Sequence, residues 1–396
     1  QMTGGNDGLN TVVPLRNDRY RAARPTLGIA ANTTLKINDD LGFHPSLRGF
    51  ARLLEAGRLA IVQGVGYPNP NRSHFESLDI WHTARREAVG RATGWLGRYL
   101  DASTQPNGER DARAIHVGGE VQPLALTSSR SAAASLRSAD QLRLTKGPEG
   151  DQWRASWERS AATSPAASPA SNPAADSGAG DLLQFVRTNS LSAWATSRRL
   201  EDAAQRTRAT TVTYPGTDLG GKLNTVARLI DAGLATRVYY VMLDGFDTHS
   251  TQPGAHAGLL SQVGDAVSSF LEDMGQRGHD RRVMLMAFSE FGRRVAENAS
   301  QGTDHGAAAP LFIAGGSIKP GVIGDLPSLE DLDDGDLKHH TDFRRVYATL
   351  LTEWLGIPHA QRQLTFAALD VDQFQALTGR GIEHSQQDVG VQIIHA

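Results

Sequence analysis

Acidic and histidine side chains recur along the chain in short polar clusters, most of which follow directly after apolar runs. The clusters are "GGNDGLN" (4–10), "NRSHFES" (71–77), "DGFDTHSTQ" (244–252), "SEFGRR" (289–294) and "GTDHG" (302–306). Carboxylates and imidazoles drawn from distant parts of a chain are the ligands that a divalent metal site needs, and they suit Zn, Mn, Fe, Mg or Ca to differing degrees. One at a time, the clusters are as typical of turns, capped loops or solvated charge runs. Together they indicate a metal site.

Two of the clusters carry an acid and a histidine close together. Asp247 and His249 are two residues apart, within reach of one loop. Asp304 and His305 are adjacent, and glycine stands on either side of them, at Gly302 and again after the histidine. We expect these glycines to let the backbone turn sharply around the pair.

The segment "YPNPNRSHFESLDIW" (67–81) leads from an apolar run into a helical pattern. Ser73 and Glu76 form the S-x-x-E pattern of a capping box, which stabilises a helix start by about 0.5–2 kcal/mol. A serine at a helix N-terminus also lies at the positive end of the helix dipole, beside free backbone N–H groups. This is a favourable place from which to attack an anionic ester, so we expect Ser73 to cap the helix and allow that it also reacts.

The elements that must position these clusters can be read from the apolar pattern. Strands are expected at 58–66, 114–119, 237–245, 281–292 and 310–316, and helices at 45–57, 74–88, 221–236, 257–278 and 342–355. The strand runs are continuously apolar rather than alternating, as in parallel sheets covered on both faces. Alternating strands and helices predict an α/β layered fold, whose ligands gather at the carboxyl ends of the strands. Gly356 is expected to end the last helix.

Composition excludes several classes of protein. The chain has 396 residues, of which 39% are hydrophobic and 21% charged, enough for a substantial core. A net charge of −3 and a pI of about 6.5 argue against a nucleic-acid-binding protein. No stretch approaches the roughly 18 consecutive apolar residues of a membrane span. Cysteine is absent, which excludes disulfides, thiolate ligands and a cysteine nucleophile and leaves the compartment open.

Most of residues 158–180 are Ala, Ser or Pro, as the string "RSAATSPAASPASNPAADSGAG" shows. We expect a surface excursion that interrupts a single domain spanning residues 1–396. A true linker between two domains is the alternative.

Seven segments of the chain together carry a family resemblance. They are "GGNDGLNTVVP", "NRSHFESLDIW", "GWLGRYLD", "GFDTHSTQ", "SEFGRRVAENAS", "GTDHGAAAPLFIAGG" and "TDFRRVYATLL". In this order, over about residues 4–356, they resemble a bacterial family catalogued as domain of unknown function 1501. That family is placed in the alkaline-phosphatase-like superfamily, with sulfatases and cofactor-independent phosphoglycerate mutases. The resemblance implies a three-layer α/β sandwich with a mostly parallel central sheet and helices on both faces. Members usually carry a twin-arginine export signal, so it also implies a periplasmic or secreted protein whose signal is missing from this chain.

The superfamily pattern assigns roles to particular positions. It has an Asp after the first strand, which Asp7 matches, and a nucleophile at a helix start, for which Ser73 is the best match. Asp247 and His249 resemble the ligand loop after a central strand.

The last two clusters can be matched to the superfamily in two ways. Order along the chain puts Glu290 in the place of an Asp, Phe291 in the place of its His, and His305 at the later His. The letters alone instead equate "TDHG" with the superfamily's Asp-His-Gly. Both matches keep Asp304 and His305 at the site. The ligands implied are Asp7, Asp247, His249, Glu290, Asp304 and His305, for one or two ions of Zn, Mn, Ca or Mg.

The chain departs from the sulfatase pattern. Sulfatases need Cys or Ser at the head of C-x-P-x-R, and this chain reads "PNPNR" at 68–72, with Pro68 at that head. A conventional sulfatase nucleophile is therefore absent. Phe291 also stands where a ligand is expected, so the chain offers fewer ligands than two full metal sites need.

The leading hypothesis is an exported, metal-dependent hydrolase of a small phosphate or sulfate ester. Its catalytic residues would be Arg72, Ser73 and His74, and its substrate-binding residues Asn10, Arg293 and Arg294. The arginines suit bidentate contacts to an anion, although surface ion pairs are the commoner role for any one of them. A non-catalytic exported binding or assembly protein, or a phosphoryl-transfer enzyme, would have the same fold. The sequence specifies neither the substrate nor the oligomeric state.

Overall fold

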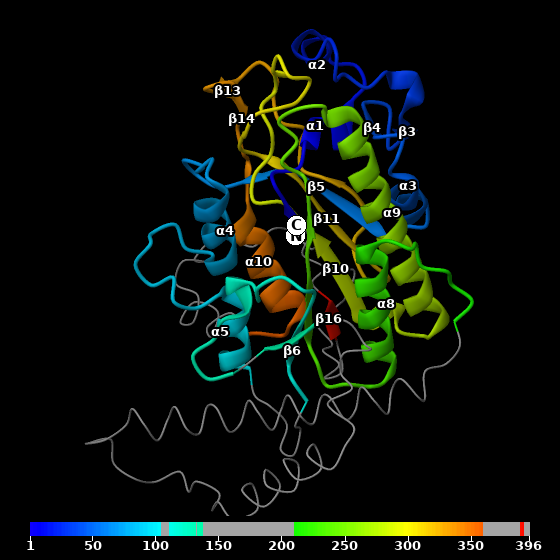
Figure 1. The fold of residues 1–396 in the computed structure, drawn as a ribbon, viewed down its shortest axis with the longest axis vertical. Coiled ribbons are helices and arrows are strands. Elements are labelled where there is room, and N and C mark those ends of the chain that lie inside the picture. Colours follow the sequence, from blue (N-terminus) through cyan, green and yellow to red (C-terminus); the bar gives the residue numbers. More distant parts are fainter. Residues whose placement is uncertain (104–110, 132, 138–209, 359–388, 392–396) are drawn as a thin grey trace, which may run out of the picture.

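The computed structural model describes residues 1–103, 111–131, 133–137, 210–358 and 389–391 (Figure 1). The excursion expected at 158–180 lies outside the described residues. Within them the largest sheet has nine strands. Their order is β12 (Gly321–Ile323), β5 (Leu59–Gly66), β11 (Ala309–Gly315), β10 (Val283–Ala287), β16 (Val389–Val391), β8 (Val238–Val241), β6 (Ala114–Val117) and β7 (Ala134–Leu136), and β15 (Thr341–Asp342) also pairs with β5. The fold is mixed α/β.

Strand β11 runs antiparallel to both of its neighbours, β10 and β5, whereas every other pair in this sheet is parallel. The sheet is therefore mixed, and its two antiparallel pairs both involve β11. The reason lies in its connection. The chain leaves β10 and stays at the same edge of the sheet through residues 288–308, without a crossover helix, so the next strand must run back.

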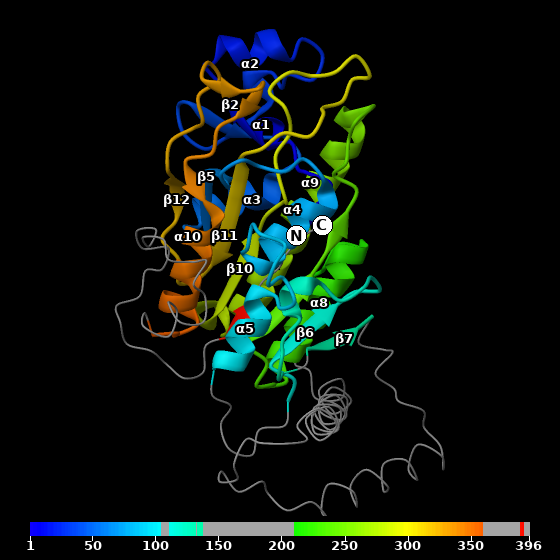
Figure 2. The ribbon, with the colours of Figure 1, turned by 90° about the vertical axis from the view of Figure 1, so that its left-hand side faces the viewer.

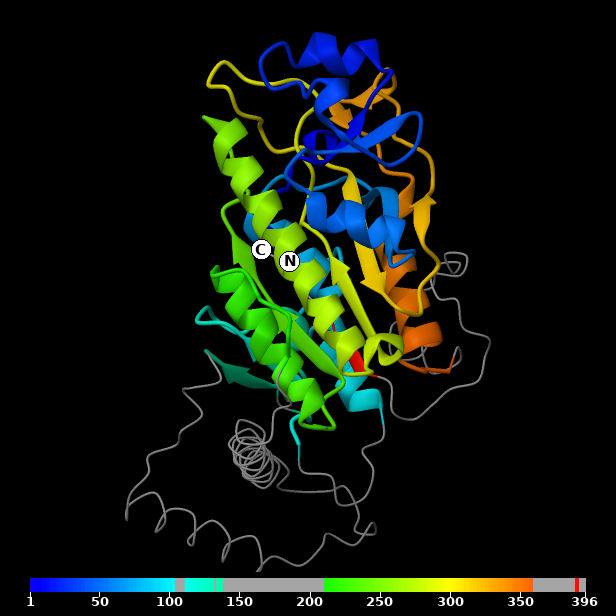
Figure 3. The ribbon, with the colours of Figure 1, turned by 90° about the vertical axis from the view of Figure 1, so that its right-hand side faces the viewer.

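Both faces of the sheet are buried under helices. One face packs against α3 (Arg48–Glu55), α8 (Asp218–Asp231) and α9 (Gln252–Gln276), as Figure 3 shows, and the other against α4 (His74–Thr83), α5 (Trp95–Ala102) and α10 (Phe343–Thr349), which face the viewer in Figure 2. Successive residues alternate between the two cores. In β10, Leu285 lies in the first core and Met284 and Met286 lie in the second. This two-sided burial explains why the strand sequences are continuously apolar.

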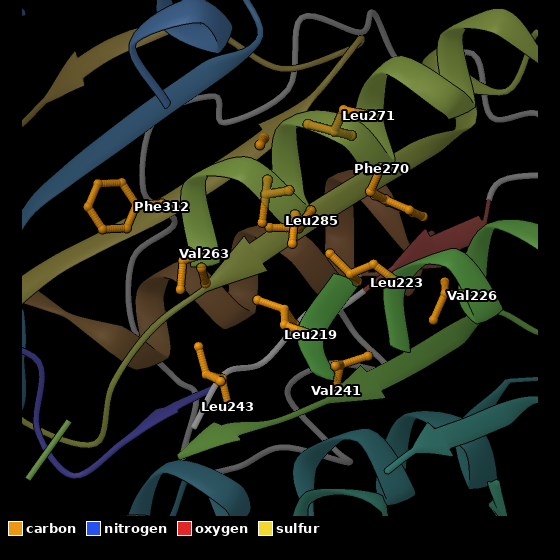
Figure 4. Packing of buried hydrophobic residues seen from close by; sticks show 14 of the residues in the cluster. Leu219, Leu223, Val226, Val241, Leu243, Val263, Phe270, Leu271, Leu285 and Phe312 are labelled. Carbon is orange, nitrogen blue, oxygen red and sulfur yellow. The ribbon is translucent and has the colours of Figure 1, made fainter. Parts of the chain in front are cut away.

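The first core joins α8 and α9 to the centre of the sheet (Figure 4). Its labelled members are Leu219, Leu223, Val226, Val241, Leu243, Val263, Phe270, Leu271, Leu285 and Phe312. Complete burial of each such side chain contributes about 1.5–3 kcal/mol. The cluster therefore fixes α9 on the sheet and, with it, the end of the loop that precedes α9.

All five expected strands and all five expected helices are present, with shifted ends. Helix α9 begins at Gln252, five residues earlier than expected, with Pro253 in its first turn. The expected strand at 237–245 is divided into β8 and β9 (Leu243–Asp244). Helix α10 continues into a π-helical turn, Leu350–Trp354, and Gly356 follows with φ of +73°, the left-handed conformation expected of a terminating glycine.

Smaller elements cover the carboxyl edge of the main sheet. They are β1 (Met2–Thr3), which pairs with β9, the sheet of β2 (Val12–Pro14), β4 (Leu41–Phe43) and β3 (Leu35–Lys36), the helices α1 (Gly8–Thr11) and α2 (Asp18–Ala23), and the hairpin of β13 (Leu332–Asp333) and β14 (Asp336–Leu337). In the described part of the chain, no helix has the length and apolarity needed to cross a membrane.

Candidate metal centre

Four segments meet at one edge of the main sheet. Strands β5 and β10 both run antiparallel to β11, so their carboxyl ends lie at the edge where β11 begins. The chain also leaves β8 and β9 there, because β8 is parallel to β10 through β16. Residues 71–74, 247–249, 288–293 and 304–305 therefore come together although they are far apart in sequence.

The centre of this arrangement is one carboxylate oxygen. Oδ1 of Asp247 lies 3.0 Å from Nε2 of His249 and 3.0 Å from Nε2 of His305. Nε2 of His74 lies 3.4 Å from the same oxygen. The two nitrogens of His249 and His305 are 2.8 Å apart. Ligand atoms about 2.0–2.2 Å from a tetrahedral ion lie roughly 3–3.5 Å from one another, and the three separations from Asp247 fall in this range. The donor atoms of His74, Asp247 and His305 all lie within 4.8 Å of one another, so these three could hold a single ion. The separation of His249 and His305 is shorter than this range and would have to widen for both rings to bind the same ion.

The other ring nitrogen of each histidine is held by an oxygen. Nδ1 of His305 lies 2.7 Å from the carbonyl oxygen of Arg72. A carbonyl oxygen only accepts, so this Nδ1 carries the proton, and Nε2 of a neutral His305 has a free lone pair. Nδ1 of His74 lies 2.8 Å from Oε1 of Glu290.

The third histidine is held in the same way. Nδ1 of His249 lies 3.2 Å from Oδ1 of Asp304, which also accepts a hydrogen bond from Asn298 at 3.1 Å. Each ring is thus oriented by an oxygen at Nδ1 and directs Nε2 inward, the arrangement typical of histidines that bind metal.

One buried nitrogen has no hydrogen-bond partner. Nε2 of His74 is inaccessible to solvent and makes no hydrogen bond within the described residues. An unpaired buried nitrogen is costly, and a metal ion at the centre would remove that cost. Three imidazole nitrogens and one carboxylate suit Zn or a similar transition metal better than Ca or Mg, which prefer oxygen ligands. The residues present therefore fit a divalent ion.

The charges at the centre favour an ionised Asp247 beside a neutral His305. Burial by itself would raise the pKa of Asp247, but the hydrogen bond and the charge of Arg293 help to outweigh it, and the pKa is lowered to about 2. Burial lowers the pKa of His305, which favours its neutral form. The hydrogen bond to Glu290 raises the pKa of His74, so a proton competes with a metal for that ring.

Arg293 is a buried support of the centre. Its side chain donates hydrogen bonds to the carbonyl oxygens of Gly5 at 2.6 Å and Thr303 at 2.7 Å, and Nη2 donates to Oδ1 of Asp247 at 2.7 Å. With its guanidinium engaged on all sides and buried, Arg293 fixes the loops. The structure places it behind Asp247, away from the solvent side where a substrate would arrive.

The glycines of the site permit close approach of backbones. A Cβ at Gly302 would lie 2.2 Å from the carbonyl carbon of His249. Gly302 does not have a positive φ, so the expected sharp turn is not the reason for glycine there. Gly4 has both a positive φ and a close backbone neighbour. Its φ is +115°, and a Cβ at this position would lie only 2.2 Å from the backbone nitrogen of Asp247.

Asp7 lies apart from the four converging donors. Its buried carboxylate pairs with Arg24 at 2.5 Å and accepts a hydrogen bond from Gln252 at 2.6 Å. It also caps α1, accepting from the backbone of Asn10 at 3.3 Å. Burial would raise the pKa of Asp7, but the charge of Arg24 more than offsets it and the pKa is lowered. The structure gives Asp7 the role of a counterion.

Asn10, expected at the substrate, is likewise buried and fully engaged. Its oxygen accepts from Tyr20 at 2.7 Å and Arg24 at 2.8 Å, and its nitrogen donates to the carbonyl of Leu27 at 2.8 Å. The segment at 4–10 thus builds the wall of the site.

Phe291 packs where the superfamily pattern would place another ligand. Its ring centroid lies 4.9 Å from that of His74 and 4.8 Å from that of His305. It therefore supports both rings by contact and supplies no donor atom.

Ser73 stands at the N-cap of α4 as expected, but its side chain makes no cap hydrogen bond. The expected capping box is not formed, because the backbone N–H of Ser73 donates to Oδ1 of Asn71 at 2.8 Å and Glu76 pairs instead with Arg91 at 2.7 Å. The hydroxyl of Ser73 is exposed and directly precedes His74.

Sequence reasoning missed the residues that hold others in place. Arg24, Gln252 and Asn298 bind Asp7 or Asp304, and of the three only Gln252, at the end of the cluster 244–252, lies in one of the polar clusters. Gln252 and Asn298 also lie within segments that carry the family resemblance.

Comparison with known proteins gives a family. No curated protein and no solved structure matches the chain. The model of one family, described as a protein of unknown function (DUF1501), matches residues 1–376. That match covers the segments that build the centre, from the loop after β1 to α10. The chain therefore belongs to the DUF1501 family.

Proposed function

We propose that this protein is an exported hydrolase of phosphate or sulfate esters that depends on one divalent metal ion. The observation that carries the proposal is the convergence of three Nε2 atoms on Oδ1 of Asp247, with every Nδ1 held by an oxygen. The ligands would be His74, Asp247, His249 and His305. Glu290 and Asp304 would orient two of the rings, and Asp7 would take no part in binding the ion.

A bound metal would supply Lewis acidity to an ester oxygen and lower the pKa of a nearby hydroxyl. Ser73 is the candidate nucleophile, because its exposed hydroxyl is not engaged in the cap and stands at the N-terminus of α4. The free N–H groups and the positive end of the helix dipole favour an anion at this place. His74, next to Ser73, is held by Glu290 at 2.8 Å.

The architecture supports the proposal as well. The mostly parallel nine-stranded sheet, covered by helices on both faces, is what an alkaline-phosphatase-like three-layer sandwich would require. Donors at the carboxyl edge of such a sheet occupy the usual ligand position of α/β folds. Export rests on the family resemblance alone.

Metal analysis of the purified protein tests the proposal. We expect about one equivalent of metal, retained through gel filtration, and a loss of most of it in His249→Ala and in Asp247→Ala. His340→Ala removes an exposed histidine outside the centre and should leave the metal content unchanged. Wild-type protein without stoichiometric metal would refute the centre.

Turnover requires a separate measurement. A panel of phosphomonoesters, phosphodiesters and sulfate esters, assayed with Zn, Mn, Mg and Ca, should identify a substrate whose hydrolysis is lost in His249→Ala. A metal-loaded protein that hydrolyses none of them would instead be a binding or assembly protein. Transfer of the phosphoryl group to an organic acceptor rather than to water would indicate a phosphoryl-transfer enzyme.

A further inference from the structure

Two arginines flank the metal centre and reach the β13–β14 hairpin above it. The carbonyl oxygen of Arg72 accepts from Nδ1 of His305 at 2.7 Å. The backbone N–H of Arg294 donates to the carbonyl oxygen of Asp304 at 3.0 Å. Both residues are thus attached directly to segments that supply or orient the metal donors, and their guanidinium groups meet on the hairpin.

One carboxylate on the hairpin is a permanent partner of these arginines. Asp336 is 2% exposed, and its Oδ2 accepts from Arg72 through Nε at 2.8 Å and Nη2 at 2.6 Å. Its Oδ1 lies 3.6 Å from Nε of Arg294. Because Asp336 is buried, an anion from solvent has no access to this side of the pair.

A second carboxylate on the same hairpin is open to solvent. The side chain of Asp334 is 75% exposed, yet its Oδ2 accepts from Nη1 and Nη2 of Arg72 and from Nη2 of Arg294, each at 3.1 Å. Asp334 and Gly335 have φ of +51° and +83°, as in the two-residue turn of a tight hairpin. The turn therefore presents one exposed oxygen to both guanidinium groups at once.

We propose that Arg72 and Arg294 form an anion subsite that Asp334 occupies in the free protein and that the phosphate or sulfate group of the substrate takes over by displacing Asp334. This inference rests on the proposed function. Two guanidinium groups face one buried carboxylate and one exposed carboxylate, so the subsite keeps its charge balance when an external anion replaces the exposed one. A tetrahedral oxyanion offers several terminal oxygens to the same N–H donors, in the geometry that arginine favours.

Displacement of Asp334 can be measured without turnover. The full chain, freed of metal by a chelator, is titrated with inorganic phosphate and with inorganic sulfate by calorimetry. Asp334→Asn removes the charge and keeps the turn, because Asn-Gly is the preferred pair in such hairpins. We expect the Kd for both anions to fall by about two- to sixfold, the effect of removing one exposed ion pair as an internal competitor.

Matched variants separate the effect of losing the Asp334 contact from the effect of changing the net charge. Asp333→Asn makes the same charge change one residue away, at an exposed side chain that forms no ion pair within the described residues, and should alter the Kd less than twofold. Arg294→Gln combined with Asp334→Asn should abolish the gain. An equal effect of the two aspartate variants, or no anion binding in either wild-type or Asp334→Asn protein, would overturn the inference.

The outcome is distinguishable from that of the proposed function. Tighter anion binding by metal-free Asp334→Asn, together with a metal-loaded protein that hydrolyses no ester, would leave the subsite intact and reject the hydrolase. If the protein is a hydrolase, the same variant should lower KM for anionic esters by a similar factor.

Discussion

Replacement of Glu290 by glutamine perturbs the metal centre and leaves all four proposed donors in place. Oε1 of Glu290 accepts from Nδ1 of His74 at 2.8 Å and from the backbone N–H of Gly4 at 2.8 Å, and Oε2 accepts from Ser289 at 3.1 Å. Glutamine keeps an oxygen for the first two contacts. Its amide can donate to the hydroxyl oxygen of Ser289, so the change removes a charge with little change of shape.

The expected magnitude follows from the position of Glu290. Loss of a partner that orients a metal-bound histidine typically weakens metal binding by about 10–100-fold, or about 1.4–2.7 kcal/mol. Glu290 is fully buried, where a charge acts more strongly than at the surface, so we expect the upper half of this range. Asp304 is 56% exposed and lies 3.2 Å from its histidine, so Asp304→Asn should fall in the lower half.

Competition with a chromophoric chelator measures these affinities. Glu297→Gln is the matched control, because Glu297 also accepts from backbone N–H groups, those of Thr26 and Leu27, and contacts no histidine of the centre. The control should bind metal as the wild type does. An unchanged metal Kd in Glu290→Gln, in protein that unfolds as the wild type does, would refute His74 as a ligand.

Two further predictions concern groups near the centre that we assign to stability. Asp7→Asn leaves Arg24 buried without its counterion and should lower the free energy of unfolding, measured in urea, by about 3–5 kcal/mol. The metal content per folded protein should stay the same. A loss of metal without a loss of stability would make Asp7 a ligand after all. Burial lowers the pKa of His256 to about 4, against the opposing charge of Asp7. The unfolded chain therefore binds more protons than the folded one between about pH 6.5 and 4, and stability falls as the pH is lowered across that window. His256→Gln should flatten this fall by roughly 3 kcal/mol, and an unaltered slope would contradict the assignment.

The sequence was sufficient to place five strands and five helices of the main layers and the edge at which the donors meet. Continuous apolar runs reported burial on both faces, and this alone located the strands that end near Asp247 and Glu290. The direction of β11 was not predictable in the same way, because apolarity carries no information about strand direction. Only the helix-free connection through residues 288–308 requires it to run back.

The roles of individual donors were harder to predict, because residue type does not record which partner a side chain meets. Asp7 and Asp247 are both acids next to glycine-rich turns after a strand. The difference between them is Arg24, which lies 17 residues from Asp7 and has no motif of its own. Likewise, Ser73 and Glu76 have capping-box spacing, but Asn71 and Arg91 are the partners that the folded chain provides.

In the proposed centre three of the six expected ligands remain, Asp247, His249 and His305, and His74 joins them. The hydrogen bonds at Nδ1 explain why Glu290 and Asp304 are not among the proposed ligands. Glu290 and Asp304 each already accept two hydrogen bonds at the oxygen that faces a histidine, one from that ring and one from Gly4 or Asn298 respectively. A direct bond to metal would compete with the contact that aims the ring.

Each of these contacts also joins two different segments. The histidine ring in segment 71–74 is supported by segment 288–293. The ring in 247–249 is supported by 304–305, and the ring in 304–305 is supported by 71–74. Because every ring is held by a segment other than its own, the donors stay aligned only when all four segments are in place. Donors aligned in this way by the fold, before any ion binds, leave room for one ion at the oxygen of Asp247, and this is the physical reason for expecting one equivalent of metal rather than two.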